Sequence, residues 1–272
     1  MFKPTAKVIC DSFNTETGDR LTTMIIEYHR FVHSEFMTHR MLSKNSSSSR
    51  AIPVSKLIQN VIDDDVYPLH WGKNQKGMQA SKEIADIANA KMLWEIARNN
   101  AINSARQLSE LGVHKQVVNR LLEPFSTITV IVSGTDWDNF FKQRCHIDAQ
   151  PEIRILADEM CIAYENSKPD RLDLGEWHTP LIDDDDDLGF FETLKVSTGR
   201  CARVSYLNHE GVRDIEDDIL LHDKLIASFP PHLSPFEHQA VAAPKSKYYA
   251  NFKGFKQYRK FIEENDNTYL RY

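Results

Sequence analysis

The sequence lacks paired cysteines, an excess of positive charge and long apolar runs. Its four cysteines, Cys10, Cys145, Cys161 and Cys201, form no C-x-x-C pair, which argues against a zinc knuckle, a dithiol redox site and a disulfide framework. The net charge of -6, with an isoelectric point near 6.0, argues against duplex nucleic acid as a partner. The chain has no run of about eighteen apolar residues and no apolar leader segment, so we expect no membrane contact, no export and a cytoplasmic location.

The residues that are present predict a folded core and a β-hairpin. Of the 272 residues, 41% are hydrophobic, which is enough for one large domain or two small ones. Residues 5–13 and 21–28 are typical of strands, and the turn-forming residues 14–19 between them predict a hairpin. The β-branched run at residues 127–132 is typical of a buried strand.

Helical periodicity covers much of the remaining chain. One helix is predicted from Phe31 and is expected to carry His39 and Arg40, after which the serine-rich residues form a loop that ends at Pro53. Residues 81–111 give the clearest pattern, with apolar side chains at three- and four-residue steps. Further helices are predicted at residues 114–123, 136–145, 151–164 and 217–228, and residues 194–206 fit a strand or a helix.

A polar, acidic stretch suggests where the chain divides. We expect a main domain over residues 1–168, an acidic linker over 169–189 and a C-terminal segment over 190–272 that completes the fold and the active site. The linker contains five adjacent aspartates at residues 183–187. They lack the spacers and the glycine of a calcium loop, so we interpret them as solvated charge, not as a metal site.

Residues 38–50, T-H-R-M-L-S-K-N-S-S-S-S-R, combine fixed positive charge with hydroxyl donors. Arg40 and Arg50 stay charged at any working pH and offer forked donors, while the serine hydroxyls add neutral donors around phosphate oxygens. We interpret this segment as part of a nucleotide site. A flexible surface linker is the alternative, because serine runs commonly form linkers.

Three further blocks combine arginine, histidine, hydroxyls and aromatic rings. Residues 134–154 hold an aromatic helix with Asn139 and Arg144, and residues 251–260 interleave four basic side chains with aromatic ones. The third block comprises C-A-R-V-S-Y at residues 201–206 and P-P-H-L-S-P-F-E-H-Q-A at residues 230–240. Taken singly, each block also fits ordinary core and solvated surface.

Together, these blocks resemble the flavin-dependent thymidylate synthases. In that family the A-R-V-S-Y and S-P-F-E-H blocks precede the serine-rich signature, whereas here they follow it, so the chain is similar to a permuted member or to two partly decayed copies. The resemblance implies an α+β fold, an antiparallel sheet flanked by long helices. It also implies a homotetramer, a homo-oligomer whose active sites collect residues from several subunits.

The resemblance further implies a reaction and its cofactors. The expected reaction is FAD-dependent methylation of dUMP to dTMP, with methylenetetrahydrofolate as the folate carbon donor and NADPH as reductant. Hydroxymethylation of a deoxypyrimidine nucleotide is an alternative, and so is a catalytically inactive nucleotide-binding homologue. A metal hydrolase is a further alternative, but His29 and His33 have no third ligand or H-E-x-x-H motif beside them. We therefore expect no metal.

Site residues follow from the resemblance by matching motifs. Arg144 matches the arginine that contacts the uracil ring, and His232 matches the histidine near the isoalloxazine. The residues that match flavin contacts are His39, Arg40, Asn139, Ser205 and Ser234. The residues that match nucleotide contacts are Ser46, Ser47, Ser48, Ser49, Arg50 and Arg120.

Several positions depart from the family pattern. Glu35 stands where a nucleotide-binding glutamine is expected, and Thr38 stands where the first arginine is expected. We infer that Gln257, with Arg259 or Lys260, supplies the missing phosphate contacts from the C-terminal segment. Ser46, Ala51 and Thr135 replace a glutamate, a tyrosine and a flavin-binding arginine.

Overall fold

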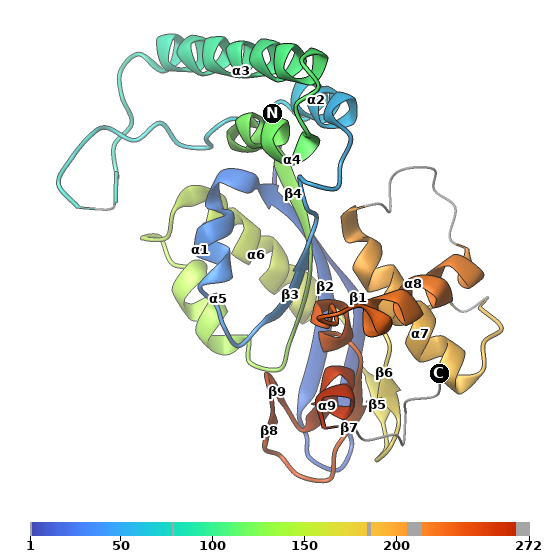
Figure 1. Ribbon diagram of the computed structural model, residues 1–272. Coiled ribbons are helices and arrows are strands. Elements are labelled where there is room, and N and C mark those ends of the chain that lie inside the picture. Colours follow the sequence, from blue (N-terminus) through green and yellow to red (C-terminus); the bar gives the residue numbers. More distant parts are fainter. Residues whose placement is uncertain (1, 78, 184–185, 206–213, 265–272) are drawn as a thin grey trace.

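The computed structural model describes residues 2–77, 79–183, 186–205 and 214–264. They form an α+β fold with mainly antiparallel sheets, as expected (Figure 1). Within these ranges, no helix combines the length and the apolar character needed to cross a membrane.

A five-stranded sheet, in the order β3-β4-β2-β1-β5, forms the centre of the molecule. The predicted hairpin is confirmed by the antiparallel pairing of the first two strands, and the predicted strand at residues 127–132 is confirmed as β4. Only the last strand runs parallel to its neighbour. The strands are β1 (Thr5–Asn14), β2 (Arg20–His29), β3 (Ser43–Ser46), β4 (Thr127–Gly134) and β5 (Asp170–Leu172).

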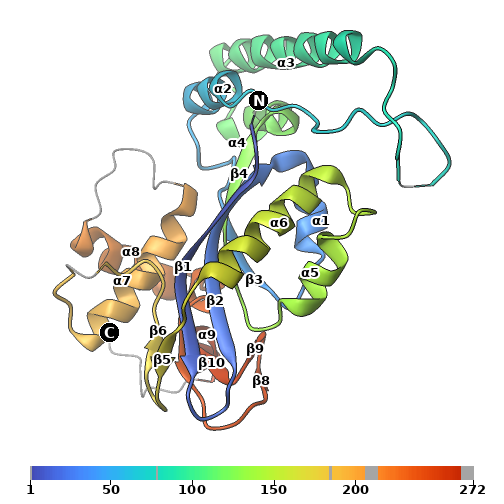
Figure 2. The same cartoon turned by 180° about the vertical axis from the view of Figure 1, so that it is seen from behind.

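The alternation of side chains along the strands gives this sheet two buried faces. Met24 and Ile26 point into the largest core cluster, whereas Ile25, between them, packs in a second cluster with Ile131. The first face is covered by α1 (His33–Met37), α5 (Asp138–Arg144) and α6 (Pro151–Asn166). The second is covered by α7 (Phe190–Ala202) and η4 (Arg203–Ser205), and α8 (Ile215–Ala227) packs on α7 (Figures 1 and 2).

The C-terminal part adds a second, smaller sheet. β6 (Trp177–His178), β7 (Ala240–Ala242) and β10 (Phe255–Gln257) form it, so residues 169–189 contribute strands to both sheets. The short turn η5 (Ser234–Glu237) leads into β7, and α9 (Tyr258–Glu263) follows β10. A separate two-stranded hairpin consists of β8 (Tyr248–Tyr249) and β9 (Phe252–Lys253).

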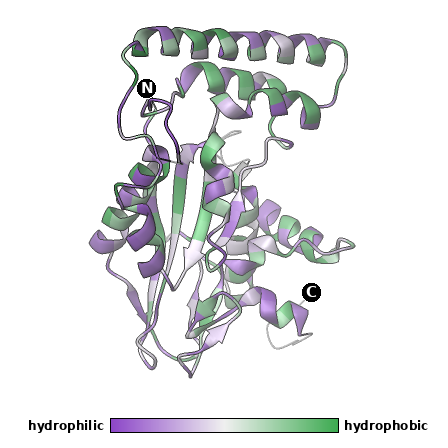
Figure 3. Ribbon diagram, turned by 90° about the vertical axis from the view of Figure 1, so that its left-hand side faces the viewer, coloured by the Kyte–Doolittle hydropathy of each residue, from purple (hydrophilic) through white to green (hydrophobic). Residues whose placement is uncertain are grey.

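A helical layer lies at one end of the sheet. It consists of α2 (Val54–Asp63), α3 (Ile87–Glu110), α4 (Lys115–Val118) and the short turns η2 (Asn119–Leu121) and η3 (Glu123–Phe125). Figure 3 shows α3 lying across this end, outside α2. Only Ile102 and Ala105 of α3 are buried, and Met92, Leu93 and Ile96 are exposed.

Three sequence predictions for helices need correction. The helix expected to carry His39 and Arg40 ends at Met37, and the expected loop begins only at residue 47, because Ser43–Ser46 pair with β4 as the strand β3. The long helix begins at Ile87, where the Asp86 carboxylate caps it by accepting the amide of Asn89 at 3.0 Å. The helix predicted at 114–123 is broken into α4, η2 and η3.

The other helix predictions are confirmed, with small changes at the ends. The segments expected at residues 136–145, 151–164 and 217–228 form α5, α6 and α8. Residues 194–206, which fitted a strand or a helix, belong mostly to α7, which begins earlier.

The aspartate run is not entirely solvated, contrary to our expectation. Asp186 pairs with Arg200, whose Nη2 donates to its carboxylate at 3.0 Å. The Arg200 side chain is only 2% exposed, and its Nε also donates to Asp218 at 3.2 Å. This part of the run therefore neutralises a buried arginine of α7.

Candidate functional site

A cavity of about 600 Å³ lies beside the serine run. It is open to solvent and is lined by β3 and the residues after it, by the start of α4, by the ends of α7 and α8 and by the segment that leads into η5. The lining residues are Asn45, Ser46, Ser48, Arg50, Ala51, His114, Lys115, Gln116, Ala202, Leu225, His232, Ser234 and Pro235.

The serine run alternates between this cavity and the interior. Ser46, Ser48 and Arg50 line the cavity. Ser47 instead accepts the backbone amide of Thr129 at 3.2 Å, and the Ser49 hydroxyl donates to a Glu123 carboxylate oxygen at 2.7 Å. Of the four serines, only Ser46 and Ser48 therefore face the cavity, as expected for an extended segment, in which successive side chains point to opposite sides.

The cavity lining is positively charged. Arg50 and Lys115 contribute two cations. Lys115 donates one of its three N–H groups to the carbonyl of Ala51 at 2.7 Å. Its described lining residues include no carboxylate and no cysteine. Hydroxyl, amide and imidazole groups from Ser46, Asn45 and His232 supply neutral polar contacts, so the lining suits an anion.

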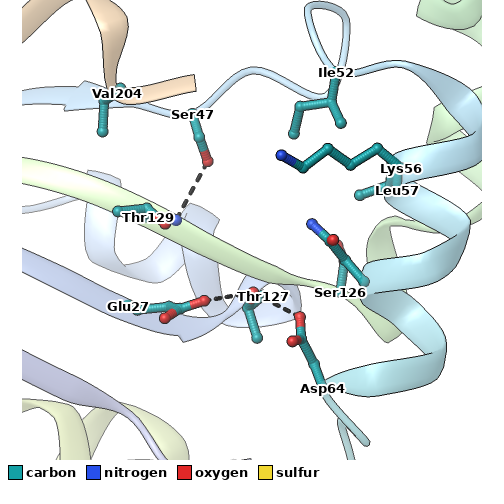
Figure 4. Close-up of a pocket in the computed structure, with 11 residues that line it drawn as sticks. Glu27, Ser47, Ile52, Lys56, Leu57, Asp64, Ser126, Thr127, Thr129 and Val204 are labelled. Carbon is teal, nitrogen blue, oxygen red and sulfur yellow. Dashed lines mark hydrogen bonds between the residues drawn. The ribbon is translucent and has the colours of Figure 1, made fainter. Parts of the chain in front are cut away.

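A smaller pocket of about 210 Å³ lies behind the serine run and has a different character (Figure 4). The Thr127 hydroxyl contacts a carboxylate oxygen of Glu27 at 2.8 Å and one of Asp64 at 3.1 Å. A hydroxyl has one proton to donate, so one contact requires a protonated carboxyl. In line with this, burial raises the pKa of Asp64. The carboxylates of Glu27 and Asp64 make this pocket unsuited to phosphate.

A second group of predicted residues meets at the end of α5. Arg144 Nε donates to His39 Nε2 at 2.9 Å, so this nitrogen carries a lone pair and the imidazole proton lies on Nδ1. Burial, helped by the positive charges of Arg144 and Lys44, lowers the pKa of His39 to about 4. The ring also packs on the edge of Phe140, with centroids 4.8 Å apart.

Lys44 joins this group from β3. Its ammonium donates to the carbonyl oxygen of His39 and lies 5.8 Å from the centroid of the Phe36 ring. Burial lowers the pKa of Lys44 to about 8, against the opposing effect of Glu237. Among the described residues, neither Lys44 nor Arg144 has a carboxylate within ion-pair distance.

The C-terminal segment reaches the signature through Gln257. Its side-chain amide donates to the Ser43 hydroxyl at 2.9 Å and to the Glu237 carbonyl at 2.8 Å. Arg259 pairs with the carboxylates of Glu237 and Glu263. Both side chains are therefore committed to internal contacts, and their role as phosphate donors stays a prediction.

A chain of buried hydrogen bonds fixes the end of η5 to the central sheet. His238 Nδ1 contacts Ser133 Oγ at 2.8 Å, Ser133 contacts Thr23 at 2.6 Å, and Thr23 contacts His178 Nε2 at 2.7 Å. All four side chains are fully buried. Burial lowers the pKa values of His178 and His238 to about 3, so both rings are neutral at pH 7. The network thereby anchors the segment that presents His232 and Ser234.

The predicted site residues thus fall into two groups within one chain. Ser46, Ser48, Arg50, His232 and Ser234 line the cavity, and His39 and Arg144 form the second group. The remaining predicted residues lie outside both groups, or their side chains are outside the described part of the chain. Arg40 and Asn139 are exposed, Arg120 pairs with Glu123 at 2.8 Å, Ser47 and Ser49 face inward, and the Ser205 side chain lies outside the described residues.

Sequence reasoning missed several residues of these groups. Lys44 lies inside the signature, and its position there is a signal that was present in the sequence. His114, Lys115 and Gln116 come from a segment more than sixty residues later, and no motif marks them. Among the described residues, no three His, Cys, Asp or Glu side chains are grouped as metal ligands would be. His29 ends β2, as expected, and is buried.

Comparisons with known proteins give a family and two similar solved structures. Two crystal structures of the UMP/dUMP methylase PolB from Streptomyces cacaoi, bound with 5-Br dUMP and with 5-Br UMP, are similar, at 13% and 14% identity. Their TM-scores are 0.47 and 0.48, over 60% of this chain and 90% and 89% of theirs. No curated protein matches in sequence. The sequence profile of one family matches residues 20–169, more than half of the chain, and this chain therefore belongs to the thymidylate synthase complementing protein family, Thy1.

Proposed function

We propose that this protein methylates dUMP to dTMP with FAD, methylenetetrahydrofolate and NADPH. The observation that supports this most is the cavity beside the serine run, with Arg50 and Lys115 in its lining and no carboxylate among its described residues. A phosphate monoester needs such a surface, because a carboxylate beside it adds repulsion whereas guanidinium and hydroxyl donors match its oxygens. Family membership supports a nucleotide as the ligand.

Each group of residues has a distinct task in this proposal. Arg50 with the hydroxyls of Ser46 and Ser48 holds the nucleotide phosphate, and Arg144 contacts the uracil ring as a fixed cation. His39 accepts from Arg144 Nε, so the guanidinium is oriented and its other N–H groups remain for the ring oxygen. The described cavity lining holds no cysteine, so the protein supplies no thiol nucleophile there.

The residues present also suit a flavin dinucleotide. His232 and Ser234 in the cavity lining and His39 in the second group, together with the exposed Arg40 and Asn139, offer polar contacts for a ring system and a diphosphate. Bound FAD supplies hydride chemistry, and the protein orients the reactants and excludes water.

We further propose that the active form is a homotetramer. The two groups of site residues are separate within one chain, and the exposed apolar side chains of Met92, Leu93 and Ile96 on α3 suit burial against another copy. Different copies then complete each site. Analytical ultracentrifugation of the full chain tests this proposal, with Leu93→Lys as the variant that disrupts the apolar surface of α3. The proposal is contradicted if the unsubstituted protein is a monomer at all concentrations and Leu93→Lys sediments in the same way.

The nucleotide site is tested by comparing Arg50→Gln with Arg120→Gln. Both arginines are exposed, but only Arg50 lines the cavity, whereas Arg120 pairs with Glu123. Loss of a charge-assisted contact is expected to weaken dUMP binding roughly 10- to 100-fold in Arg50→Gln and to leave Arg120→Gln near the unsubstituted protein. Calorimetric titration with dUMP measures the difference, and equal affinities of the two variants contradict the assignment.

The reaction itself is tested on the unsubstituted protein. With dUMP, FAD, methylenetetrahydrofolate and NADPH, a product heavier by one methylene unit supports thymidylate formation. A product with one additional oxygen supports hydroxymethylation instead. A protein that binds dUMP but neither binds FAD nor turns over contradicts the flavin-dependent reaction and supports the inactive homologue.

A further inference from the structure

Lys44 lies on the opposite face of β3 from the residues that contact the C-terminal part. Ser43 and Asn45 on one face bond Gln257 and the carbonyl of Cys201, respectively. Lys44, between them, points to the side of α1 and α5, where its ammonium meets the carbonyl of His39. This lysine is therefore part of the Arg144 group and does not line the serine-run cavity.

The Arg144 group has more positive charge than the protein itself balances. Both cations are partly buried, yet neither has a carboxylate partner among the described residues. Glu237, the acidic residue that acts most on Lys44, is already paired with Arg259. Partly buried cations without a counter-charge are costly to a fold, so their presence together points to an anionic ligand.

The donor count identifies the kind of anion. Lys44 uses one of its three N–H donors and Arg144 uses one of its five, which leaves six between them. Six donors and two charges exceed what one carboxylate can accept, and they match a group with several oxygens and a charge near -2. The rings of Phe36 and Phe140 beside the group exclude water and strengthen each contact.

We propose that Lys44 binds the diphosphate of the flavin dinucleotide, and that Arg144 divides its four remaining N–H groups between this diphosphate and the uracil ring oxygen. This inference rests on the proposed flavin dependence and adds to it a binding residue that the family signature does not assign. Lys44 also helps to keep His39 neutral, because its positive charge opposes protonation of that imidazole. His39 then stays an acceptor for Arg144.

Lys44 makes flavin binding sensitive to alkaline pH. The ammonium is charged below a pKa of about 8 and loses its proton as the pH rises through that value. The other charged or titratable groups near it are His33, His39, Glu237 and Arg144. Of these, His33 and His39 have lowered pKa values and are already neutral, so Lys44 dominates the change near pH 8.

The test compares Lys44→Met with Lys44→Arg in the full chain. Flavin fluorescence titrations at pH 7 and pH 9 measure binding of FAD and of riboflavin, which lacks phosphate. Lys44→Met is expected to weaken FAD binding roughly 10- to 100-fold at pH 7 and to change riboflavin binding little. Lys44→Arg is expected to retain FAD binding at pH 7 and to keep at pH 9 the affinity that the unsubstituted protein loses.

Matched controls separate this site from the proposed function and from folding. Lys142→Met removes an exposed lysine of the same α5 region and should leave FAD binding unchanged. If the unsubstituted protein binds no FAD, the proposed function fails and this site fails with it. If the unsubstituted protein binds FAD, three results for Lys44→Met overturn only the diphosphate site. They are an unchanged affinity for FAD, an equal loss of affinity for FAD and riboflavin, and a loss of affinity for dUMP alone.

Discussion

Arg200 is buried and Arg144 is partly buried, and the protein treats their charges in opposite ways. Arg200, in α7, donates to Asp186 and Asp218 and to a backbone carbonyl, so its charge is balanced inside the fold. Arg144, at the end of α5, donates to a neutral imidazole and has no acidic partner among the described residues. Balanced charge serves the fold, whereas unbalanced charge is available to a ligand.

The same distinction separates neighbouring side chains. Arg203 Nε lies 2.8 Å from the second oxygen of Asp218 as an ion pair, so Arg203 belongs with the balanced set. Lys44 belongs with the unbalanced set, beside Arg144. The presence or absence of an acidic partner therefore separates structural cations from ligand-binding ones, although both look alike in the sequence.

The largest expected effect is on the balanced set. Arg200→Met removes the guanidinium that pairs with the nearly buried Asp186, and it takes away one of the two arginines beside the buried Asp218. Breaking a buried pair in this way should lower the free energy of unfolding by about 3–5 kcal/mol. Urea unfolding at pH 7 measures it. Adding Asp218→Asn should recover part of the loss, and a cost below about 1 kcal/mol contradicts the structural role of Arg200.

An intermediate effect is expected from the neutral buried imidazoles of His178 and His238. Burial lowers their folded pKa values to about 3, below the usual 6.5. A depressed folded pKa means that stability is fully present above pH 6.5 and is lost as the pH falls toward 3. Between pH 7 and pH 5 we expect a loss of roughly 2 kcal/mol per histidine, measured by urea unfolding.

A histidine comparison isolates this effect. His238→Gln should be less stable than the parent at pH 7 but should show a smaller loss on acidification. The exposed His146 offers a matched control, and His146→Gln should reproduce the parent profile. If His238→Gln keeps the full acid dependence, the buried ring is not its source.

The smallest effect on folding is expected from the unbalanced set. Arg144→Gln should change the free energy of unfolding by less than about 1 kcal/mol, because no buried carboxylate is left unpaired. Binding of dUMP should nevertheless weaken. Parallel unfolding and calorimetric titrations measure both quantities, and a stability loss as large as that of Arg200→Met removes the distinction between the two arginines.

Periodicity in the sequence was sufficient to predict the strands and helices in which buried residues recur at one regular spacing. The hairpin of β1 and β2, the strand β4 and the helices α5 and α6 were predicted because apolar residues recur along them at strand or helix spacing. The serine run was predicted as a loop, since its composition is that of a linker. Residues 47–53 do form this loop, but Ser43–Ser46 at its start form β3, because the edge of β4 offers backbone partners to Ser43 and Asn45 and backbone pairing does not require apolar side chains.

The site was predictable only where its residues share a local motif. Arg50 and Arg144 were found from their motifs, whereas Lys115 has no local mark and reaches the cavity because α4 packs beside the serine run. The sequence also did not reveal that Asp186 pairs with Arg200, because ion pairs between distant segments depend on how helices pack.

The amino-acid sequence alone determined the family, the element types of the regular segments and the presence of two arginine-containing signatures. These follow from local spacing, which every chain carries before it folds. Tertiary structure alone decided which serines face the cavity, which arginines keep acidic partners and that Lys44 stands beside Arg144. Those features depend on contacts between segments far apart in the chain, and no local pattern encodes them.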